Sequence, residues 1–293
     1  MQSLNKRIYS SLILAGVLAL MILRAPVLLV FALLATIVIV ALLEFYAIIR
    51  QTGTPSYRYL GIAGGIVLIG TTFYVYIFNG GANAAEYELA VLFGIFLALC
   101  IRQFPQKLNG QPLGTIACTM LGLLYIPFLF NFFIKLGLAW DHNNFFSSVG
   151  LTGRLLSFYL IAVVKCTDIG AFLTGSRFGK HKLFPRLSPG KTWEGFSGGM
   201  LFGLLVSLSL FFLCRGHFGH KLMTLTDALV LGICLPLLGM AGDLIESLLK
   251  RAGGAKDAGT YIPGMGGLLD VLDSLLTAVP FFYFYTLWFL PTI

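Results

Sequence analysis

The sequence predicts an all-α membrane protein, a polytopic integral membrane helical bundle of about nine transmembrane helices with its N-terminus in the cytoplasm. Hydrophobic residues make up 58% of the 293 residues and charged residues only 11%, whereas a soluble domain keeps roughly a quarter of its residues charged. The mean hydropathy of +0.89 implies more apolar surface than one water-soluble core could hide. Apolar runs of membrane-spanning length also recur along the whole chain, so most helix faces must meet lipid.

Each apolar run is a candidate transmembrane helix, because a helix crosses about 30 Å of hydrocarbon with roughly 20 residues at 1.5 Å per residue. Pro26 divides the first two runs, since a helix seldom continues through the residue before a proline. Lys6 and Arg7 precede the first run as in a signal peptide, but no small-residue cleavage site follows, so we expect this run to be retained. The nine runs are centred on residues 9–23, 27–48, 59–79, 87–101, 114–134, 155–175, 195–214, 226–248 and 274–291.

The orientation follows from the basic residues, which are enriched in the cytoplasmic loops of membrane proteins. With the N-terminus inside, loops 176–194 and 249–273 both face the cytoplasm, where soluble nucleotides are. This bias also explains the net charge of +8, so nucleic acid is not an expected partner. The predicted cytoplasmic set is Lys6, Arg7, Arg50, Arg58, Arg102, Lys107, Arg177, Lys180, Lys182, Arg186, Lys191, Lys250, Arg251 and Lys256. The predicted outer set is Arg24, Lys135, Arg154, Arg215 and Lys221.

The two halves of the chain differ in character. Residues 1–150 are spans joined by short turns and predict a scaffold of transmembrane helices, whereas acidic residues gather in residues 151–293, which predict the catalytic region. Small-residue pairs such as Gly199 and Gly203 indicate close helix packing in lipid. The five cysteines lie in or beside apolar runs without metal-site spacing, and His217 and His220 have no third ligand nearby, so neither group predicts a metal site.

Lys165 and Asp168 are ionisable residues inside a predicted span, where such residues are costly and need a reason. Their i, i+3 spacing places them on one helical face. They can form a self-contained ion pair, a part of an active site, or the proton or ion relay of a transporter. The segment that follows them favours an active site.

This segment, from Gly170 to Gly195, carries basic residues interleaved with glycine, serine and proline. Ser188, followed by Pro189, is a candidate N-cap of the next helix, which would direct free backbone N–H groups and Lys191 toward an anion. Gly190, Lys191 and Thr192 suggest a P-loop. That motif needs a glycine where Pro185 stands, so this interpretation is rejected.

A second polar segment, from Gly242 to Leu276, contains Asp270 and Asp273 on one helical face and Asp243 with Ser247 on another. A bend at the intervening glycines would bring three carboxylates together. Carboxylate oxygens are the ligands that Mg²⁺ prefers beside substrate phosphates, and Lys256 with its basic neighbours would bind the remaining phosphate charge. Glu246 and Lys250, at i, i+4, are expected to form an ordinary surface ion pair.

This second segment resembles the signature of the phosphatidate cytidylyltransferase family, also called CDP-diacylglycerol synthases. The residues from 168 to 195 resemble that family's other conserved block, and together the two blocks cover roughly 65 residues. The matching residues of the signature are Ser247, Lys250, Arg251, Lys256, Asp257, Gly259, Ile262, Pro263, Gly266, Gly267, Asp270 and Asp273.

The resemblance implies a Mg²⁺-dependent transfer of CMP from CTP to phosphatidic acid. It leaves open whether the enzyme binds a second cation. It implies a bacterial inner-membrane enzyme that faces the cytoplasm and leaves room for a homodimer. By the same resemblance the metal ligands are Asp243, Asp270 and Asp273, the catalytic residues are Lys256, Asp257 and Asp168, and the substrate-binding residues are Ser188, Lys191, Lys250, Arg251 and Ser247.

Two residues depart from the family pattern, since Met265 stands where the family usually has histidine and Val271 where it has arginine. Either other residues supply those phosphate contacts, or the rate or the substrate differs. A CTP-dependent lipid kinase acting on a polyprenyl or phytyl alcohol is an alternative, because it could use a similar nucleotide site. A transporter that uses Lys165 and Asp168 is the alternative from another class.

Overall fold

The computed structural model describes residues 25–104, 109–141, 149–254 and 267–292. Within them lie eight helical segments that are long and apolar enough to cross a membrane, which confirms a polytopic helical membrane protein. The first predicted run, 9–23, lies outside the described residues. The segments are α2 (Val27–Gln51), α3 (Arg58–Asn79), α4 (Ala84–Gln103), α5 with η1 and α6 (Pro112–Leu138), α7 (Leu151–Phe178), α8 (Trp193–Cys214), α9 (Leu225–Ala252) and α10 (Leu269–Trp288).

The fourth described span is a composite of α5 (Pro112–Leu123), the π-helical turn η1 (Leu124–Phe128) and α6 (Leu129–Leu138). Pro127 lies inside η1. A proline has no N–H and clashes with the preceding turn of an α-helix, and a wider turn accommodates both effects while the chain stays helical.

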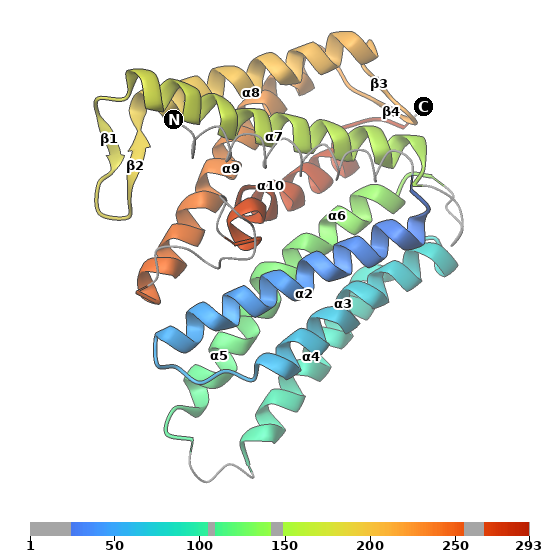
Figure 1. The fold of residues 1–293 in the computed structure, drawn as a ribbon. Coiled ribbons are helices and arrows are strands. Elements are labelled where there is room, and N and C mark those ends of the chain that lie inside the picture. Colours follow the sequence, from blue (N-terminus) through green and yellow to red (C-terminus); the bar gives the residue numbers. More distant parts are fainter. Residues whose placement is uncertain (1–24, 105–108, 142–148, 255–266, 293) are drawn as a thin grey trace.

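The helices form two neighbouring groups (Figure 1). Helices α7 and α8 lie side by side along one flank, and α9 and α10 lie between them and the group formed by α2 to α6. One continuous cluster of buried hydrophobic residues runs from α2 to α10 and so joins both groups. The predicted division at residue 150 therefore has no separate core on each side, and its functional meaning stays a prediction.

Glycines set the closest helix contacts, as the sequence predicted. A Cβ atom at Gly198 would collide with the side chain of Thr174 on α7, and one at Gly203 would collide with Pro236 on α9. A Cβ atom at Gly61 on α3 would likewise collide with the Tyr46 ring on α2. These positions allow backbones to approach closely where lipid supplies no hydrophobic drive between helices.

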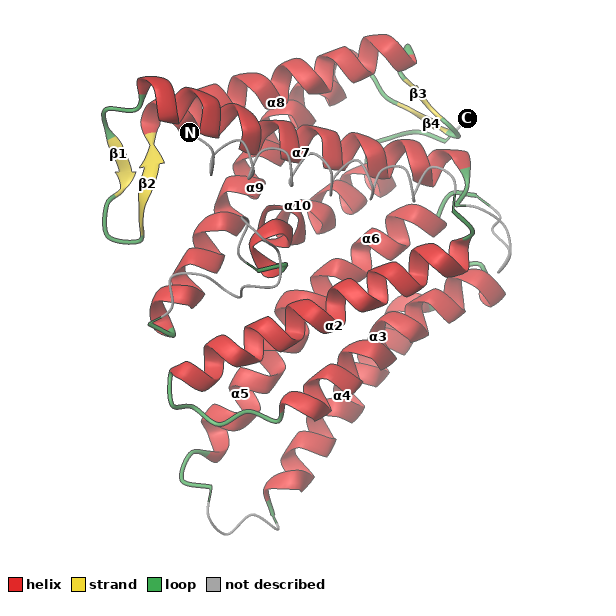
Figure 2. Cartoon of the chain, in the orientation of Figure 1, coloured by secondary structure: helices red, strands yellow, loops and turns green. Residues whose placement is uncertain are grey.

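Two short antiparallel hairpins mark opposite ends of the bundle (Figure 2). Strands β1 (Lys182–Phe184) and β2 (Ser188–Thr192) pair beyond the C-terminal end of α7, and β3 (His217–Phe218) pairs with β4 (Lys221–Leu222) at the other end. The second hairpin is anchored by Lys221, which is buried, donates to the Leu290 carbonyl at 2.8 Å and lies 4.3 Å from the centre of the Trp140 ring. This burial lowers the pKa of Lys221.

The hairpin at residues 182–192 corrects one prediction. Ser188 is not the N-cap of a helix and Pro189 is not its first residue, because both belong to β2. The helix begins at Trp193, and the Thr192 hydroxyl accepts a hydrogen bond from the Gly195 N–H at 3.1 Å. Pairing of Ser188 with Phe184 in the hairpin extends the backbone and moves the helix start four residues along the chain.

Candidate active site

The Lys165 ammonium group lies at the junction of α7 and α10. Its Nζ donates to Asp168 Oδ2 at 3.1 Å, to the Ser274 hydroxyl at 2.8 Å and to the Val271 carbonyl at 2.7 Å. Ser274 also donates to Asp168 Oδ2 at 3.1 Å. The predicted pair on α7 is therefore not self-contained, because it ties α7 to the N-terminal part of α10.

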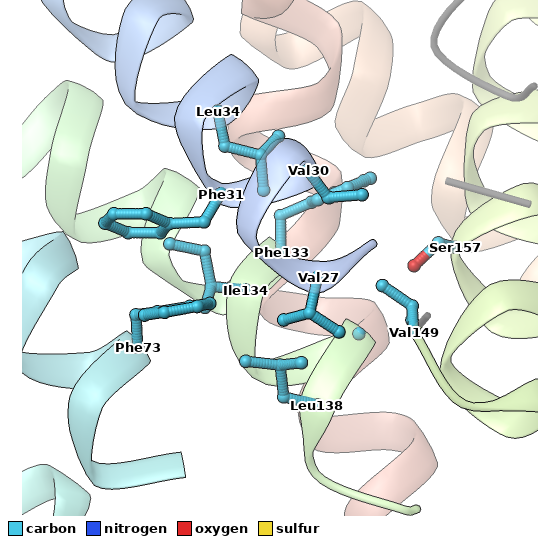
Figure 3. Close-up of a pocket in the computed structure, with 11 residues that line it drawn as sticks. Val27, Val30, Phe31, Leu34, Phe73, Phe133, Ile134, Leu138, Val149 and Ser157 are labelled. Atoms are coloured by element: carbon cyan, nitrogen blue, oxygen red, sulfur yellow. The ribbon is translucent and has the colours of Figure 1, made fainter. Parts of the chain in front are cut away.

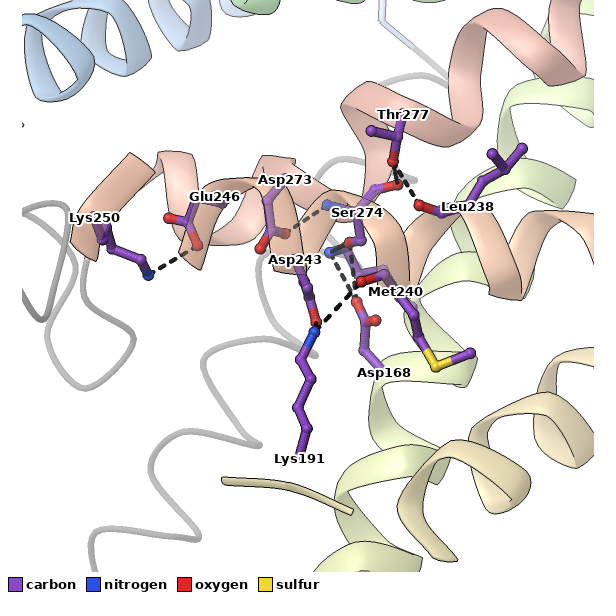
Figure 4. A network of polar contacts seen from close by, with 11 residues as sticks. Asp168, Lys191, Leu238, Met240, Asp243, Glu246, Lys250, Asp273, Ser274 and Thr277 are labelled. Carbon is purple, nitrogen blue, oxygen red and sulfur yellow. Dashed lines mark hydrogen bonds and ion pairs between the residues drawn. The ribbon is translucent and has the colours of Figure 1, made fainter. Parts of the chain in front are cut away.

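Asp243 on α9 and Asp273 on α10 form the centre of the site (Figure 4). Their carboxyl groups lie close enough for their charges to interact, and both project toward the side from which Lys191 arrives. Lys191, on β2, places its Nζ 2.9 Å from Asp243 Oδ2. Asp168 is close enough to Asp243 for their charges to interact. The basic loop thus reaches the acidic helices, and the phosphate-binding role of Lys191 stays a prediction.

Gly242 allows this approach of α9 to α10. A Cβ atom at Gly242 would collide with the backbone carbonyl of Asp273 and crowd the Thr277 hydroxyl. Thr277 donates instead to the Leu238 carbonyl at 2.7 Å, which bridges the two helices one turn away (Figure 4). The glycine therefore brings the two backbones together at the position where their aspartates meet.

A second carboxylate pair, Glu246 and Asp270, lies nearer the C-terminal end of α9. Lys250 Nζ contacts Glu246 Oε2 at 2.8 Å and Asp270 Oδ1 at 2.6 Å, and Asp270 Oδ2 accepts from the Gly267 N–H at 2.7 Å. The predicted Glu246–Lys250 pair is present, but its expected surface position is wrong. Glu246 is only 2% exposed because this face of α9 packs against α10.

Glu44 on α2 is a site residue that the sequence interpretation missed. It is 1% exposed, and its two carboxylate oxygens accept from the backbone N–H groups of Leu268 at 2.9 Å and Leu269 at 2.7 Å. It thus caps the N-terminus of α10, where helix N–H groups lack partners and negative charge is favoured. A lone acid within an apolar run was the signal that could have identified it.

The remaining predicted residues are less closely tied to this cluster. Ser188 is half-buried on β2, and Ser247 is half-buried one turn beyond Asp243. Arg251 is exposed, with its Nε 3.4 Å from the Leu187 carbonyl of the hairpin. The predictions for Lys256, Asp257 and Met265 fall outside the described residues.

The cluster carries an excess of negative charge. Among the described residues it holds five carboxyl groups and three ammonium groups, which leaves two negative charges if all are ionised. Buried carboxylates without partners are costly, so such a cluster favours a bound cation or proton. The negatively charged members are Asp168, Asp243, Glu246, Asp270 and Asp273, and the positively charged members are Lys165, Lys191 and Lys250.

The three predicted metal ligands do not meet at one point. Asp243 and Asp273 are adjacent, whereas Asp270 is held by Lys250, and the described residues contain no group of three or more carboxylate, imidazole or thiol side chains in a metal-ligating arrangement. Mg²⁺ needs fewer protein ligands, because it is usually bound through one or two carboxylates with water and substrate phosphates. The donor set therefore fits Mg²⁺, and the metal role stays a prediction.

The accessible part of the cluster faces Lys191. The side chains of Asp168 and Asp243 are each 30% exposed and that of Lys191 is 24% exposed, whereas that of Glu246 is 3% exposed. A small cavity of about 20 Å³ lies elsewhere, at the opposite end of α2, and Val27, Phe73, Leu138 and other apolar side chains line it (Figure 3). It has room for about one water molecule, so it is not the substrate site.

The fold and the site define a helical membrane protein in which α7, α9 and α10 bring carboxylates and lysines together. The model of the cytidylyltransferase family matches residues 5–289. The chain belongs to this family, which confirms the resemblance drawn from the sequence and the class of nucleotidyltransferase.

Curated relatives agree with this membership. The chain is 33% identical to a phosphatidate cytidylyltransferase of Staphylococcus haemolyticus over 83% of this chain and 94% of the relative. It is 42% identical to a phosphatidate cytidylyltransferase of Haemophilus influenzae, over 45% of this chain and 46% of that relative. It is also 32% identical to the uncharacterized protein YnbB of Escherichia coli over 83% and 74% of the two chains.

Proposed function

We propose that this protein is a phosphatidate cytidylyltransferase of phospholipid biosynthesis. An oxygen of the phosphatidic acid phosphate attacks the α-phosphorus of CTP, and the bond from that phosphorus to the oxygen bridging the β-phosphate breaks. Pyrophosphate leaves with the bonding electron pair, and CDP-diacylglycerol is the lipid product. The protein forms no covalent bond in this scheme.

The observation that carries this proposal is the excess of carboxylates over lysines where α7, α9 and α10 meet. A divalent cation would offset two negative charges there, and Asp243 and Asp273, with Asp168 beside Asp243, would hold it. Bound Mg²⁺ would stabilise charge on the phosphate oxygens during transfer. Asp270 would join this set when Lys250 turns toward a substrate phosphate.

The lysines supply the complementary charge. Lys191 contacts Asp243 from the hairpin, and Lys250 contacts Glu246 and Asp270 from the last turns of α9. Each ammonium group can exchange a carboxylate oxygen for a phosphate oxygen when its side chain turns toward the substrate. In this proposal the lysines therefore bind CTP and the lipid phosphate, while Lys165 positions Asp168 and Ser274.

The placement of the site suggests how both substrates arrive. The hairpin at residues 182–192 and the end of α9 lie at the same end of the bundle (Figure 1), which we assign to the cytoplasmic face of a bacterial inner membrane. CTP would enter from water, while the acyl chains of phosphatidic acid stay in the inner leaflet. A homodimer is compatible with this arrangement.

Product analysis with purified protein tests the proposal. With phosphatidic acid, labelled CTP and Mg²⁺, we expect a labelled liponucleotide and pyrophosphate. Asp273→Asn and Asp270→Asn should each lower the rate by roughly 100-fold or more, because metal sites lose 10–100-fold even when an outer-shell partner is removed. Glu86→Gln, which removes an exposed acid on α4, is the matched control and should keep the native rate.

The same assay separates the other functions. A lipid kinase would release CDP and transfer the γ-phosphate to an alcohol, and a transporter would move its substrate without consuming CTP. Either result, or equal liponucleotide from the native protein and Asp273→Asn, would overturn the proposal.

A further inference from the structure

A groove with a basic rim lies between α2, α3 and the end of α4. Its volume is about 1150 Å³. Along α2 it is lined by Leu43, Tyr46, Ala47 and Arg50, which follow the i, i+3, i+4, i+7 spacing of one helix face. Glu44 points from another face of α2 to α10, so the groove is separate from the carboxylate cluster.

Three arginines from different helix ends line this groove. Arg50 is at the C-terminal end of α2, Arg58 begins α3 and Arg102 is in the last turn of α4. All three are exposed, and the ion pairs of the described residues include none of them. Arg58 donates to the hydroxyl of its neighbour Tyr59 and lies over that ring, which leaves its charge uncompensated.

The walls of the groove are apolar further from the rim. Leu43 is seven residues from Arg50 along α2, which corresponds to about 10 Å. Leu60 and Ala63 line the facing side on α3. The groove thus joins a cationic end to an apolar wall along the direction in which the helices cross the bilayer, as an amphiphile requires.

Hydrogen bonds hold the floor of the groove in place. The Tyr46 hydroxyl donates to the Thr119 carbonyl at 2.9 Å, and the Tyr57 N–H donates to the Thr119 hydroxyl at 3.1 Å. The Tyr57 hydroxyl lies 3.4 Å from the Arg102 carbonyl. The loop between α2 and α3 is therefore fastened to both α5 and α4. A general bias of basic residues toward one side of the membrane explains their presence at this end, but not their convergence on one groove.

We propose that this groove binds an anionic phospholipid at a site distinct from the reaction centre. Arg50, Arg58 and Arg102 would bind the headgroup phosphate, since guanidinium groups match phosphate oxygens in geometry and charge. One acyl chain would lie against Leu43 and Ala63. A nucleotide or free phosphate satisfies the arginines but leaves this wall against water, so the groove favours a lipid.

Native mass spectrometry of the full chain in detergent tests this site. The probes are phosphatidylglycerol, which is anionic, and phosphatidylcholine with the same acyl chains, which is zwitterionic. We expect phosphatidylglycerol to be retained at least about tenfold better by the native protein. The triple variant R50Q/R58Q/R102Q should lose this preference, and Arg215→Gln, at the other end of the bundle, should keep it.

A second variant tests the wall without changing charge. Ala63→Phe adds bulk inside the groove and should reduce phosphatidylglycerol retention although all three arginines remain. Equal retention by the native protein and the triple variant would overturn the proposal. So would displacement of the lipid by inorganic phosphate or CTP at equal concentration, or crosslinking of two copies through Ala63→Cys, which would identify a different occupant.

Discussion

Glu44 shows how one side chain on the second predicted span governs the geometry of residues more than 220 positions away. Its carboxylate holds the two backbone N–H groups that begin α10, and Asp270 and Asp273 follow directly. In a bilayer, a helix N-terminus buried without such a partner is strongly unfavourable. Glu44 is therefore a positioning residue, which acts on the site through the start of α10.

Substitution of Glu44 tests this positioning role. Glu44→Ala should lower the free energy of unfolding by roughly 3 kcal/mol, since it leaves two buried donors unsatisfied, and it should lower kcat more than it raises KM for CTP. Glu44→Gln, which keeps one acceptor oxygen, should restore part of both. Thermal unfolding in detergent and steady-state kinetics measure these effects. A stable Glu44→Ala protein with native kcat would contradict the role.

Ionisable residues inside apolar runs correctly indicated polar contacts within the bundle. The cost of charge in lipid identified Lys165 and Asp168, which do contact each other, and the same rule applied to Glu44 would have identified it. Glu246 was misplaced because i, i+4 spacing with Lys250 describes a surface pair equally well. Only the packing of α9 on α10 decides that its side chain is buried.

Helices α9 and α10 make the central contact of the site. Their aspartates meet because Gly242 has no side chain between the backbones. Sequence periodicity placed Asp270 with Asp273 and Asp243 with Ser247 on common faces, but the distance between the two helices depends on this close approach. Spacing alone therefore could not show that Asp243 meets Asp273 while Asp270 turns to Lys250.

Gly242→Ala tests this element contact. The added methyl group would push α9 from the Asp273 carbonyl, so we expect a loss of about 1–3 kcal/mol in stability and a larger loss of activity. Gly94→Ala on α4 is the matched control, because a Cβ atom there would meet nothing within 4 Å, and it should be neutral or slightly stabilising. Equal effects from the two substitutions would contradict the close-contact argument.

The start of α8 illustrates the limit of local signals. Both Ser188, followed by Pro189, and Thr192 are acceptable helix N-caps by sequence. Hairpin pairing of β2 with β1 decides between them, and the register of two strands is set by contacts across the turn rather than by the capping residues. This outcome also moves Lys191 off the helix and onto the strand that reaches Asp243.

For the molecule as a whole, the order and length of the apolar runs predicted the fold well. Each of the eight described spans matches a predicted run, although α7 and α9 extend beyond it and α10 begins at Leu269 rather than near residue 274. These extensions are polar turns that hydropathy assigns to loops. Tertiary contacts, including the one from Glu44, keep them helical.

The orientation of the bundle in the membrane can be tested by cysteine labelling. In a variant whose five cysteines are replaced by alanine, His220→Cys should react with a membrane-impermeant maleimide in intact cells, whereas Arg186→Cys should react only after permeabilisation. Both residues are exposed and lie near opposite hairpins. Labelling of both cysteines after permeabilisation is the control. The reverse pattern in intact cells would place the hairpin at residues 182–192 outside.

The link between Glu44 and α10 also bears on how the chain is made. Glu44 enters the membrane early in synthesis, but the amides it binds are 224 and 225 positions further along. Until α10 is inserted, this acid lacks these two N–H partners. Its burial among lipid chains is therefore unfavourable while the chain assembles. We therefore expect the insertion machinery or a chaperone to shelter α2 during translation, and the last helix to release it.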